Sequence, residues 1–250
     1  YNYLESLYLL GDEHLFYDAL NNIISEKILS SKTASISSHA SIRFNRKDKY
    51  PLCSQPLDYI YKKNLLEDGK LNKNDMRKII DISKIDTAVL RRQELLEGGR
   101  QTSGNIFDND SSITQHFLDI ITNELQKYKL AFPDECELIS SFPENYKIRG
   151  WLIEIENAGF LKPHIHERGW ISGSIYLSLP LNRQGDEGNI RFSTDGMDYP
   201  KDDKSFPMKV VDLGLGDIVL FPSSLFHSTI PFNSNHRRIT LAFDVIPSKI

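Results

Sequence analysis

The spacing of the apolar residues changes near Pro133, and this change constrains the fold more than any other feature of the chain. Before Pro133, apolar residues recur three and four positions apart, which is the spacing of amphipathic helices. After it, short runs alternate apolar and polar residues between turns that contain glycine or asparagine. The sequence therefore predicts an α+β fold whose strands form a barrel or a double-sheet jelly roll.

Seven short strands are expected in the second half, with several helices packed on one outer face. These strands are expected at 146–155, 170–179, 189–192, 208–211, 217–221, 228–232 and 239–245. The helices are expected as a pair within 1–29 and singly at 74–82, 87–96 and 113–125, the last capped by Ser112. Residues 98–112 are rich in glycine, asparagine, aspartate and serine and are interpreted as a loop.

We predict an N-terminal helical region, 1–97, followed by a β-rich domain, 98–250. Leu4, Leu7 and Gly11, followed by an amphipathic stretch, resemble part of a tetratricopeptide-type repeat. One such unit is too little for a solenoid, so a plain helical hairpin that packs on the β-domain is an equally good interpretation. The N-terminal helices are also where a protein partner is expected.

Composition excludes several classes of protein. A net charge of −4 and a sequence pI near 6.0 argue against a nucleic-acid or anionic-membrane surface, and no apolar run is long enough to span a bilayer. The two cysteines, Cys53 and Cys136, lie in unrelated contexts and are interpreted as structural thiols, which favours the cytoplasm. Because the chain opens at Tyr1 without methionine, we expect it to be part of a longer protein.

Three histidines are candidates for a metal site. A residue and its second neighbour on a strand project from the same face, so His164 and His166 converge if the stretch after Pro163 is a strand. His227 on a later strand would complete a cluster around a divalent cation of iron, zinc, copper or nickel. A lone His-x-His pair is more often a pair of partly exposed histidines. The order and spacing of all three favour metal binding.

The residues around these histidines resemble the 2-oxoglutarate- and Fe(II)-dependent oxygenases. The resemblance covers 98–245 and is strongest from Trp151 onward. It rests on His-x-His at 164–166, Ser-Gly-x-x-Tyr at 172–176, Phe-Pro-x-x-x-x-His at 221–227 and Arg-x-Thr at 238–240. The resemblance implies a double-stranded β-helix, with Fe(II) as the metal and 2-oxoglutarate as cosubstrate.

The same resemblance implies that His164 and His227 are metal ligands. Position 166 is commonly Asp or Glu in these enzymes, and here it is His166. Three possibilities follow: His166 is a third neutral ligand, Glu167 supplies the carboxylate after a local twist, or water fills the position. We favour His166 as the ligand.

Arg238 and Thr240 match the position of the residues that hold the distal carboxylate of 2-oxoglutarate in this family. A buried arginine suits this task because its guanidinium makes paired, charge-assisted hydrogen bonds. Strand alternation places Arg237 on the opposite face, toward solvent or a surface carboxylate. Tyr176 is a further residue that could reach the cosubstrate.

The resemblance implies a dioxygenase, most often a hydroxylase, that converts 2-oxoglutarate to succinate and CO₂ while it oxidises a substrate. An amino acid, a peptidyl side chain and a small metabolite all remain open as substrate. The loops 98–112 and 196–204 could line the mouth of the barrel. Two alternatives stay open: a three-histidine cupin-like enzyme that does not use 2-oxoglutarate, and a metal-free interaction scaffold.

Overall fold

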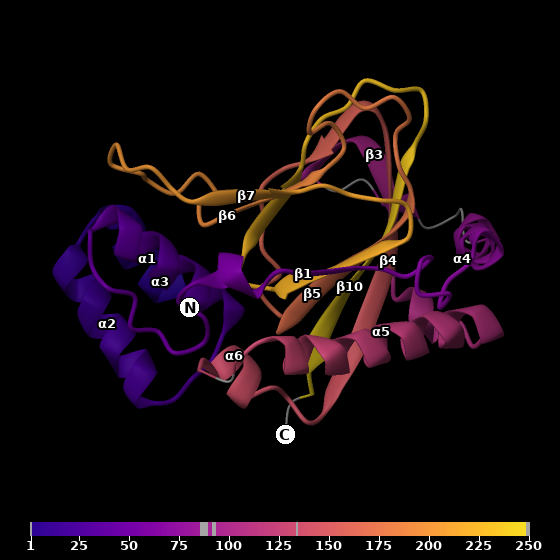
Figure 1. Ribbon diagram of the computed structural model, residues 1–250. Coiled ribbons are helices and arrows are strands. Elements are labelled where there is room, and N and C mark those ends of the chain that lie inside the picture. The colour runs from indigo at the N-terminus through magenta and orange to yellow at the C-terminus, as the bar shows by residue number, and fades with distance from the viewer. Residues whose placement is uncertain (1, 86–89, 92–93, 134, 249–250) are drawn as a thin grey trace.

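Two antiparallel sheets form the centre of the computed structural model, which describes residues 2–85, 90–91, 94–133 and 135–248 (Figure 1). Residues of both sheets line a common cavity. The strands are β1 (Tyr61–Asn64), β2 (Leu90–Arg91), β3 (Leu96–Thr102), β4 (Tyr146–Leu161), β5 (Ile171–Ser178), β6 (Ile190–Ser193), β7 (Met208–Val211), β8 (Asp217–Pro222), β9 (Phe226–Thr229) and β10 (Arg238–Pro247). The larger sheet has the order β1-β8-β5-β10-β4-β3-β2, and the smaller has the order β7-β6-β9. The strands predicted after Pro133 are thus present, with β9 beginning earlier than expected.

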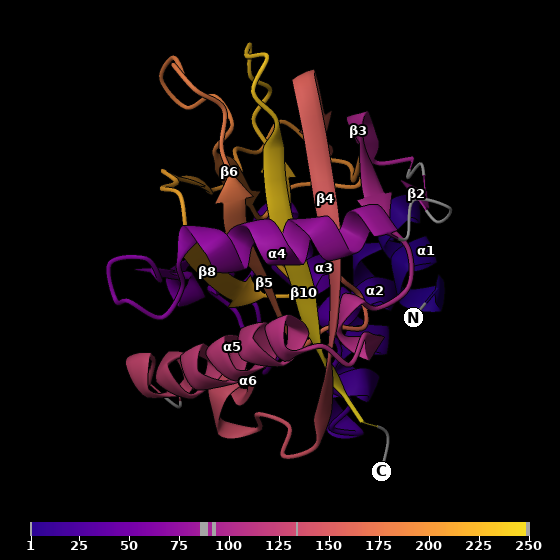
Figure 2. The same ribbon diagram turned by 90° about the vertical axis from the view of Figure 1, so that its right-hand side faces the viewer.

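Helices pack over one face and along one side of this pair of sheets (Figures 1 and 2). They are α1 (Asn2–Leu10), α2 (Glu13–Ser25), α3 (Ser31–Arg43), α4 (Lys73–Ile85), α5 (Ser112–Ala131) and α6 (Glu137–Ser140), with single turns η1 (Pro56–Tyr59) and η3 (Ile106–Asp108). Figure 2 shows α4 and α5 lying across one face of β8, β5, β10 and β4. Within the described parts of the chain, every helix is too short or too polar to cross a membrane.

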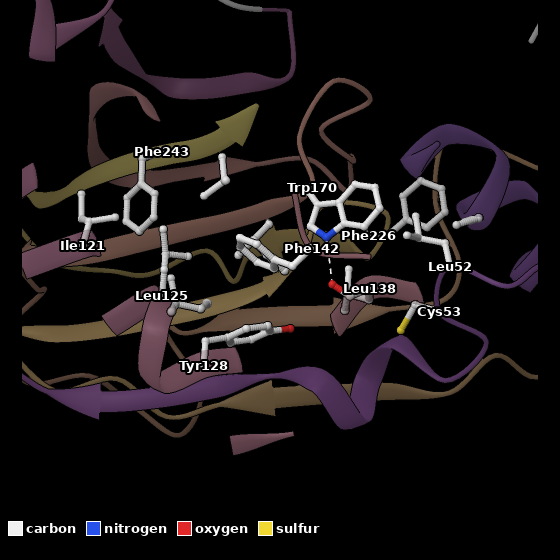
Figure 3. Packing of buried hydrophobic residues seen from close by; sticks show 14 of the residues in the cluster. Leu52, Cys53, Ile121, Leu125, Tyr128, Leu138, Phe142, Trp170, Phe226 and Phe243 are labelled. Carbon is white, nitrogen blue, oxygen red and sulfur yellow. Dashed lines mark hydrogen bonds between the residues drawn. The ribbon is translucent and has the colours of Figure 1, made fainter. Parts of the chain in front are cut away.

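Strand alternation on β10 separates the cavity from the helical layer. Leu241, Phe243 and Val245 are buried on the side that packs against α5, where Ile121 and Leu125 meet Phe243 (Figure 3). The intervening residues of β10 line the cavity instead. Because successive side chains of a strand point to opposite faces, one strand serves both the core and the cavity.

Helix α5 forms where its apolar spacing predicts it, and its start is fixed by a capping box. Ser111 accepts a hydrogen bond from the Thr114 amide at 3.3 Å, and Thr114 Oγ1 accepts one from the Ser111 amide at 3.2 Å. Such a cap satisfies backbone donors that the first helical turn leaves unpaired. The cap is therefore Ser111, one residue before the predicted Ser112.

Helix α3 was not predicted, because its buried positions are mostly small polar residues that show no amphipathic pattern. It lies with α1 and α2 beside the sheets rather than over the face that α5 covers (Figure 1). The Ser31 hydroxyl donates to the Gly169 carbonyl at 2.6 Å, and Lys32 Nζ lies 3.3 Å from the Glu167 carboxylate. Helix α3 therefore contacts the segment that immediately follows His166.

The predicted loop 98–112 is partly wrong. Leu96–Thr102 forms β3 against β4, and Ile106–Asp108 forms a 3₁₀ turn. Glycine lowers strand propensity, but here the close approach of two strands requires it: a Cβ on Gly99 would lie 2.6 Å from the Glu154 carbonyl oxygen. Pairing with β4 outweighs the local preference of the segment.

The predicted helix 87–96 lies partly outside the described residues. In the described part, Leu90–Arg91 forms β2 and pairs with β3, so the helix is wrong there. Within the predicted N-terminal region, β1 joins the larger sheet by pairing with β8. The division of the chain at 97/98 stays a prediction.

His39 on α3 yields a testable pH dependence of stability. Its ring is fully buried, its Nδ1 accepts a hydrogen bond from the Tyr8 hydroxyl, and it packs against Phe206 with ring centroids 4.1 Å apart. Burial, opposed by Asp195, lowers the pKa of His39 to about 4. Below pH 6.5 His39 is protonated in the unfolded chain but stays neutral in the folded chain. The free energy of unfolding therefore falls as the pH drops from 6.5 toward 4.

We expect His39→Gln to reduce this loss, which amounts to about 3 kcal/mol for a shift of this size. The measurement is the free energy of unfolding in urea at pH 7.5 and pH 4.5 for both proteins. His116→Gln, at a half-exposed helical position, serves as the control and should keep the wild-type slope. Equal slopes for wild type and His39→Gln would contradict the assignment.

Candidate metal centre and its cavity

The three predicted histidines meet at one point. The ligand atoms of His164, His166 and His227 all lie within 4.8 Å of one another, and the cluster is largely buried. The Nε2 atoms of His164 and His166 are 3.2 Å apart, and the ring centroids of His164 and His227 are 4.2 Å apart. The geometry therefore brings together all three candidate ligands.

The backbone reason for this convergence differs from the predicted one. His164 and His166 do not lie on a strand: His164 forms an isolated bridge with His227, and the His166 amide donates to the Ser223 carbonyl at 3.0 Å. A turn follows at 167–168, so the segment cannot continue as a strand. Two separate backbone contacts, one for each histidine, replace the expected strand geometry.

Hydrogen bonds at the Nδ1 atoms orient all three rings. His164 Nδ1 donates to the Lys162 carbonyl at 2.7 Å, and His227 Nδ1 donates to the Leu225 carbonyl at 3.1 Å. His166 Nδ1 lies 2.5 Å from the Asp244 carboxylate. Carbonyl and carboxylate oxygens accept hydrogen bonds, so each Nδ1 carries the proton and each Nε2 presents a lone pair. Three converging lone pairs are the donor set of a cation site.

Burial keeps two of these rings in the neutral form, with Nε2 unprotonated. It lowers the pKa of His164 to about 4, with the neighbouring His166 contributing in the same direction. Burial likewise lowers the pKa of His227 well below its usual value. A metal competes with protons for the same lone pairs, so low pKa values favour metal binding at neutral pH.

Asp244 was not predicted as part of the site. It lies on the cavity face of β10, and its Oδ1 also accepts a hydrogen bond from the Ser172 hydroxyl at 2.7 Å. Ser172 and Ser223 hydroxyls are 2.8 Å apart, so the carboxylate that orients His166 is itself held in place. The sequence signal was available, since Asp244 has the parity of Arg238 and Thr240 on the same strand.

We expect Asp244→Asn to weaken metal binding by about 10- to 100-fold, the usual effect of removing a partner that orients a ligand histidine. Calorimetric titration with Zn(II) and Mn(II) measures the affinity. Asp212→Asn is the control, because the Asp212 side chain is 85% exposed and lies outside the cavity lining. An unchanged affinity in Asp244→Asn would show that the hydrogen bond does not orient His166 for binding.

Glu167, the alternative carboxylate ligand, points elsewhere. Its side chain is half exposed, and its Oε1 lies 3.3 Å from Lys32 Nζ, which also contacts Glu5 at 2.9 Å. Glu167 is absent from both the histidine cluster and the cavity lining among the described residues. Its ion pair with α3 explains this orientation.

Arg238 lies in the same cavity as the histidines. It is 4% exposed; its Nε donates to the Gly188 carbonyl at 3.0 Å and its Nη1 donates to Thr240 Oγ1 at 2.9 Å. Its guanidinium carbon stands 5.0 Å from the centre of the Tyr176 ring. Burial lowers the pKa of Arg238, and no described carboxylate forms an ion pair with it.

Tyr176 lies beside this arginine and places a second polar group in need of a partner there. Its hydroxyl is buried and has no hydrogen-bond partner among the described residues. Buried polar groups are nearly always hydrogen-bonded, and a buried cation normally has a counter-ion. A bound carboxylate would satisfy Arg238 and Tyr176 together, so these residues fit the distal end of 2-oxoglutarate.

The cavity that joins these groups has a volume of about 240 Å³. The predicted mouth segment 98–112 contributes Gln101, Thr102, Ser103 and Gly104 to its lining, whereas 196–204 contributes none of the described lining residues. Arg237 points away from the cavity and pairs with Glu154, as its strand parity predicts. The arrangement offers a cation site, an anion site and open volume between them.

Comparison with known proteins supports the resemblance seen in the sequence. Residues 149–244 match the family model described as "Putative 2OG-Fe(II) oxygenase". This range contains the three histidines, Arg238 and Thr240. A comparison with curated proteins found no match.

Solved structures share the fold at low sequence identity. A prolyl-4-hydroxylase of Pseudomonas putida is 15% identical, with a TM-score of 0.51 over 76% of this chain and 93% of that one. The viral collagen prolyl hydroxylase vCPH of Paramecium Bursaria Chlorella virus-1, in its 2OG complex, is 13% identical, with a TM-score of 0.50 over 76% and 97%. The epimerase SnoN from nogalamycin biosynthesis is 12% identical, with a TM-score of 0.52 over 75% and 76%. The predicted double-stranded β-helix with helices is therefore confirmed.

Proposed function

We propose that this chain, a member of the 2-oxoglutarate- and Fe(II)-dependent oxygenase superfamily through residues 149–244, is a hydroxylase of an amino acid, a peptidyl side chain or a small metabolite. His164, His166 and His227 hold the metal, and Arg238 with Thr240 holds the cosubstrate. The observation that carries the proposal is a buried guanidinium, with no carboxylate partner among the described residues, in the same cavity as three converging imidazole lone pairs.

Each group of residues has a defined task. The three imidazoles bind through Nε2 because their Nδ1 protons are engaged by Lys162, Asp244 and Leu225. Arg238 and the Tyr176 hydroxyl orient the cosubstrate by its distal carboxylate. Bound Fe(II) and 2-oxoglutarate supply the activation of O₂, with succinate and CO₂ as the products of the cosubstrate.

Apolar walls limit water around the centre. Phe221 packs against His227 with ring centroids 4.7 Å apart, and Trp151 lies 5.6 Å from His166 at 33° between the ring planes. Ile153, Leu161 and Ile190 complete this apolar lining. Excluding water strengthens the electrostatic contacts in the cavity and protects reactive species from side reactions.

Metal-dependent release of CO₂ from carboxyl-labelled 2-oxoglutarate tests the proposal, together with detection of succinate. Turnover should require Fe(II), stop with a chelator and depend on the three histidines. Failure to bind or turn over 2-oxoglutarate, in a protein that binds metal, would contradict it.

One specific observation favours a second candidate, a three-histidine enzyme that does not use 2-oxoglutarate. His166 stands where a carboxylate ligand is common, and the cluster holds three imidazoles. Arg238 argues against this candidate, because an enzyme that does not bind 2-oxoglutarate has no need for a buried arginine that lacks a carboxylate partner among the described residues. Calorimetry with 2-oxoglutarate on the Mn(II)-loaded protein separates the two, because only the first candidate binds it.

A further inference from the structure

A second cavity arginine, Arg149, lies at the opposite end of the cavity from Arg238. Register on β4 and β10 shows this directly: Thr240 pairs with Ile153, Ala242 with Trp151, and Asp244 with Arg149. Thr240 and Asp244 are four residues apart on one strand, which corresponds to about 13 Å. Because Asp244 contacts His166, the histidine cluster lies near the Arg149 end of this row.

Arg149 is exposed, whereas Arg238 is 4% exposed, so the cavity opens toward solvent at the Arg149 end. Arg238, the residue proposed to bind the cosubstrate, thus lies at the closed end of the cavity. A substrate that enters from solvent meets Arg149 before it meets the histidines.

Arg149 has no ion-pair partner among the described residues, although an acid lies directly opposite it. Asp244 is its partner in the strand register, yet the Asp244 Oδ1 atom is taken by His166 and Ser172. An exposed strand arginine beside an aspartate would ordinarily pair with it. His166 and Ser172 hold that oxygen, and Arg149 forms no ion pair with Asp244 or another described acid, so its guanidinium is available to a ligand.

Positive charge also exceeds negative charge among the described residues that line the cavity. The described lining residues carry two guanidinium groups, Arg149 and Arg238, and one carboxylate, Asp244, so a divalent cation bound to the three histidines would bring the total to three positive charges. The 2-oxoglutarate dianion neutralises two of them. A carboxylate ligand at position 166 would have removed the remainder, but His166 carries no such charge. With metal and cosubstrate bound, one positive charge would remain, and Arg149 is the exposed cation among the described lining residues.

We propose that the substrate carries a carboxylate, which Arg149 binds while the carbon to be oxidised lies over Trp151 beside His166. This inference rests on the proposed function, since it assigns Arg238 to the cosubstrate. Trp151 is half-buried, lies next to Arg149 in the row of cavity residues on β4, and has its ring centroid 5.6 Å from that of His166, so its indole supplies an apolar surface for the carbon skeleton. Gln101 and Ser103 line the cavity from β3 and its end, and they offer polar contacts to the same ligand.

Matched pairs of acids and amides test this. Free L-amino acids and their N-acetyl derivatives are each compared with the corresponding primary amide. Binding is measured by saturation-transfer NMR on the Zn(II)-loaded, 2-oxoglutarate-bound protein, and stimulation of succinate formation is measured on the Fe(II) enzyme. We expect at least one acid to bind about tenfold or more tightly than its amide, because a charge-assisted hydrogen bond is lost in the amide.

Each variant is compared with wild type by the ratio of its affinity for the acid to its affinity for the amide. In Arg149→Gln the acid-to-amide ratio should fall close to one, and Arg149→Lys should keep part of the preference. Arg191→Gln is the matched control, because Arg191 is exposed on β6 and lies outside the cavity lining; it should keep the wild-type ratio.

Three results would overturn the inference: amides that bind as well as acids, a preference that survives in Arg149→Gln, or no acid in the panel that binds. Titration with 2-oxoglutarate alone is the separate check on the proposed function. If 2-oxoglutarate binds and the preference is absent, only the inference about Arg149 fails. If 2-oxoglutarate does not bind, the proposed function fails, and the acid preference is then measured on the Zn(II)-loaded protein alone.

Discussion

Replacing His227 with alanine should abolish metal-dependent succinate formation and weaken metal binding by roughly a hundredfold or more, since each ligand of a protein metal site contributes about 3 kcal/mol. The His227 ring is buried between His164 and Phe221, and its Nε2 lone pair points into the cluster. Calorimetry with Zn(II) and Mn(II) reports affinity without requiring turnover.

Two further variants make this result specific. His166→Asp should still bind metal, because it restores the carboxylate that is common at this position. Glu167→Gln should behave as wild type in metal binding, because Glu167 pairs with Lys32 and lies outside the cluster. Loss of binding in Glu167→Gln, with full binding in His166→Ala, would show that the ligand set is wrong.

Arg238→Gln should reduce the affinity for 2-oxoglutarate by about a hundredfold, within the range observed when one partner of a buried charge pair is removed. The effect is large because Arg238 is buried and already oriented by Gly188 and Thr240 before any ligand arrives. The measurement is calorimetric titration of the Mn(II)-loaded protein with 2-oxoglutarate.

Arg237→Gln provides the neighbouring control for this prediction. Arg237 lies on the opposite face of the strand and pairs with Glu154, so its removal should leave 2-oxoglutarate affinity as in wild type. Equal losses in both variants would point to general damage to β10. An unchanged affinity in Arg238→Gln would place the cosubstrate elsewhere.

Much of the candidate site could be predicted from spacing along the chain. Arg238 and Thr240 share the cavity face, and Arg237 the other, because alternation along a strand depends only on sequence separation. His164, His166 and His227 converge as expected, but for a different reason. Their backbone is held by contacts with residues about sixty positions away, which no local pattern encodes.

The two residues that sequence analysis did not assign, Asp244 and Arg149, acquire their roles only from partners. Asp244 lies 78 positions from the ring that it orients. Arg149 lies opposite Asp244 in the strand register and forms no ion pair with a described residue, whereas Asp244 contacts His166. Both assignments require knowing which strands are neighbours and in what register.

Sequence alone was sufficient to predict helix α5, the strands after Pro133, and the shared face of Arg238 and Thr240. These features follow from local periodicity and turn residues. Contacts with distant residues, which local patterns do not encode, make α3 a buried helix and the glycine-rich stretch at 96–102 a strand. The same contacts place the Asp244 carboxylate against His166 of the histidine cluster, because burial and pairing with distant residues outweigh local preference.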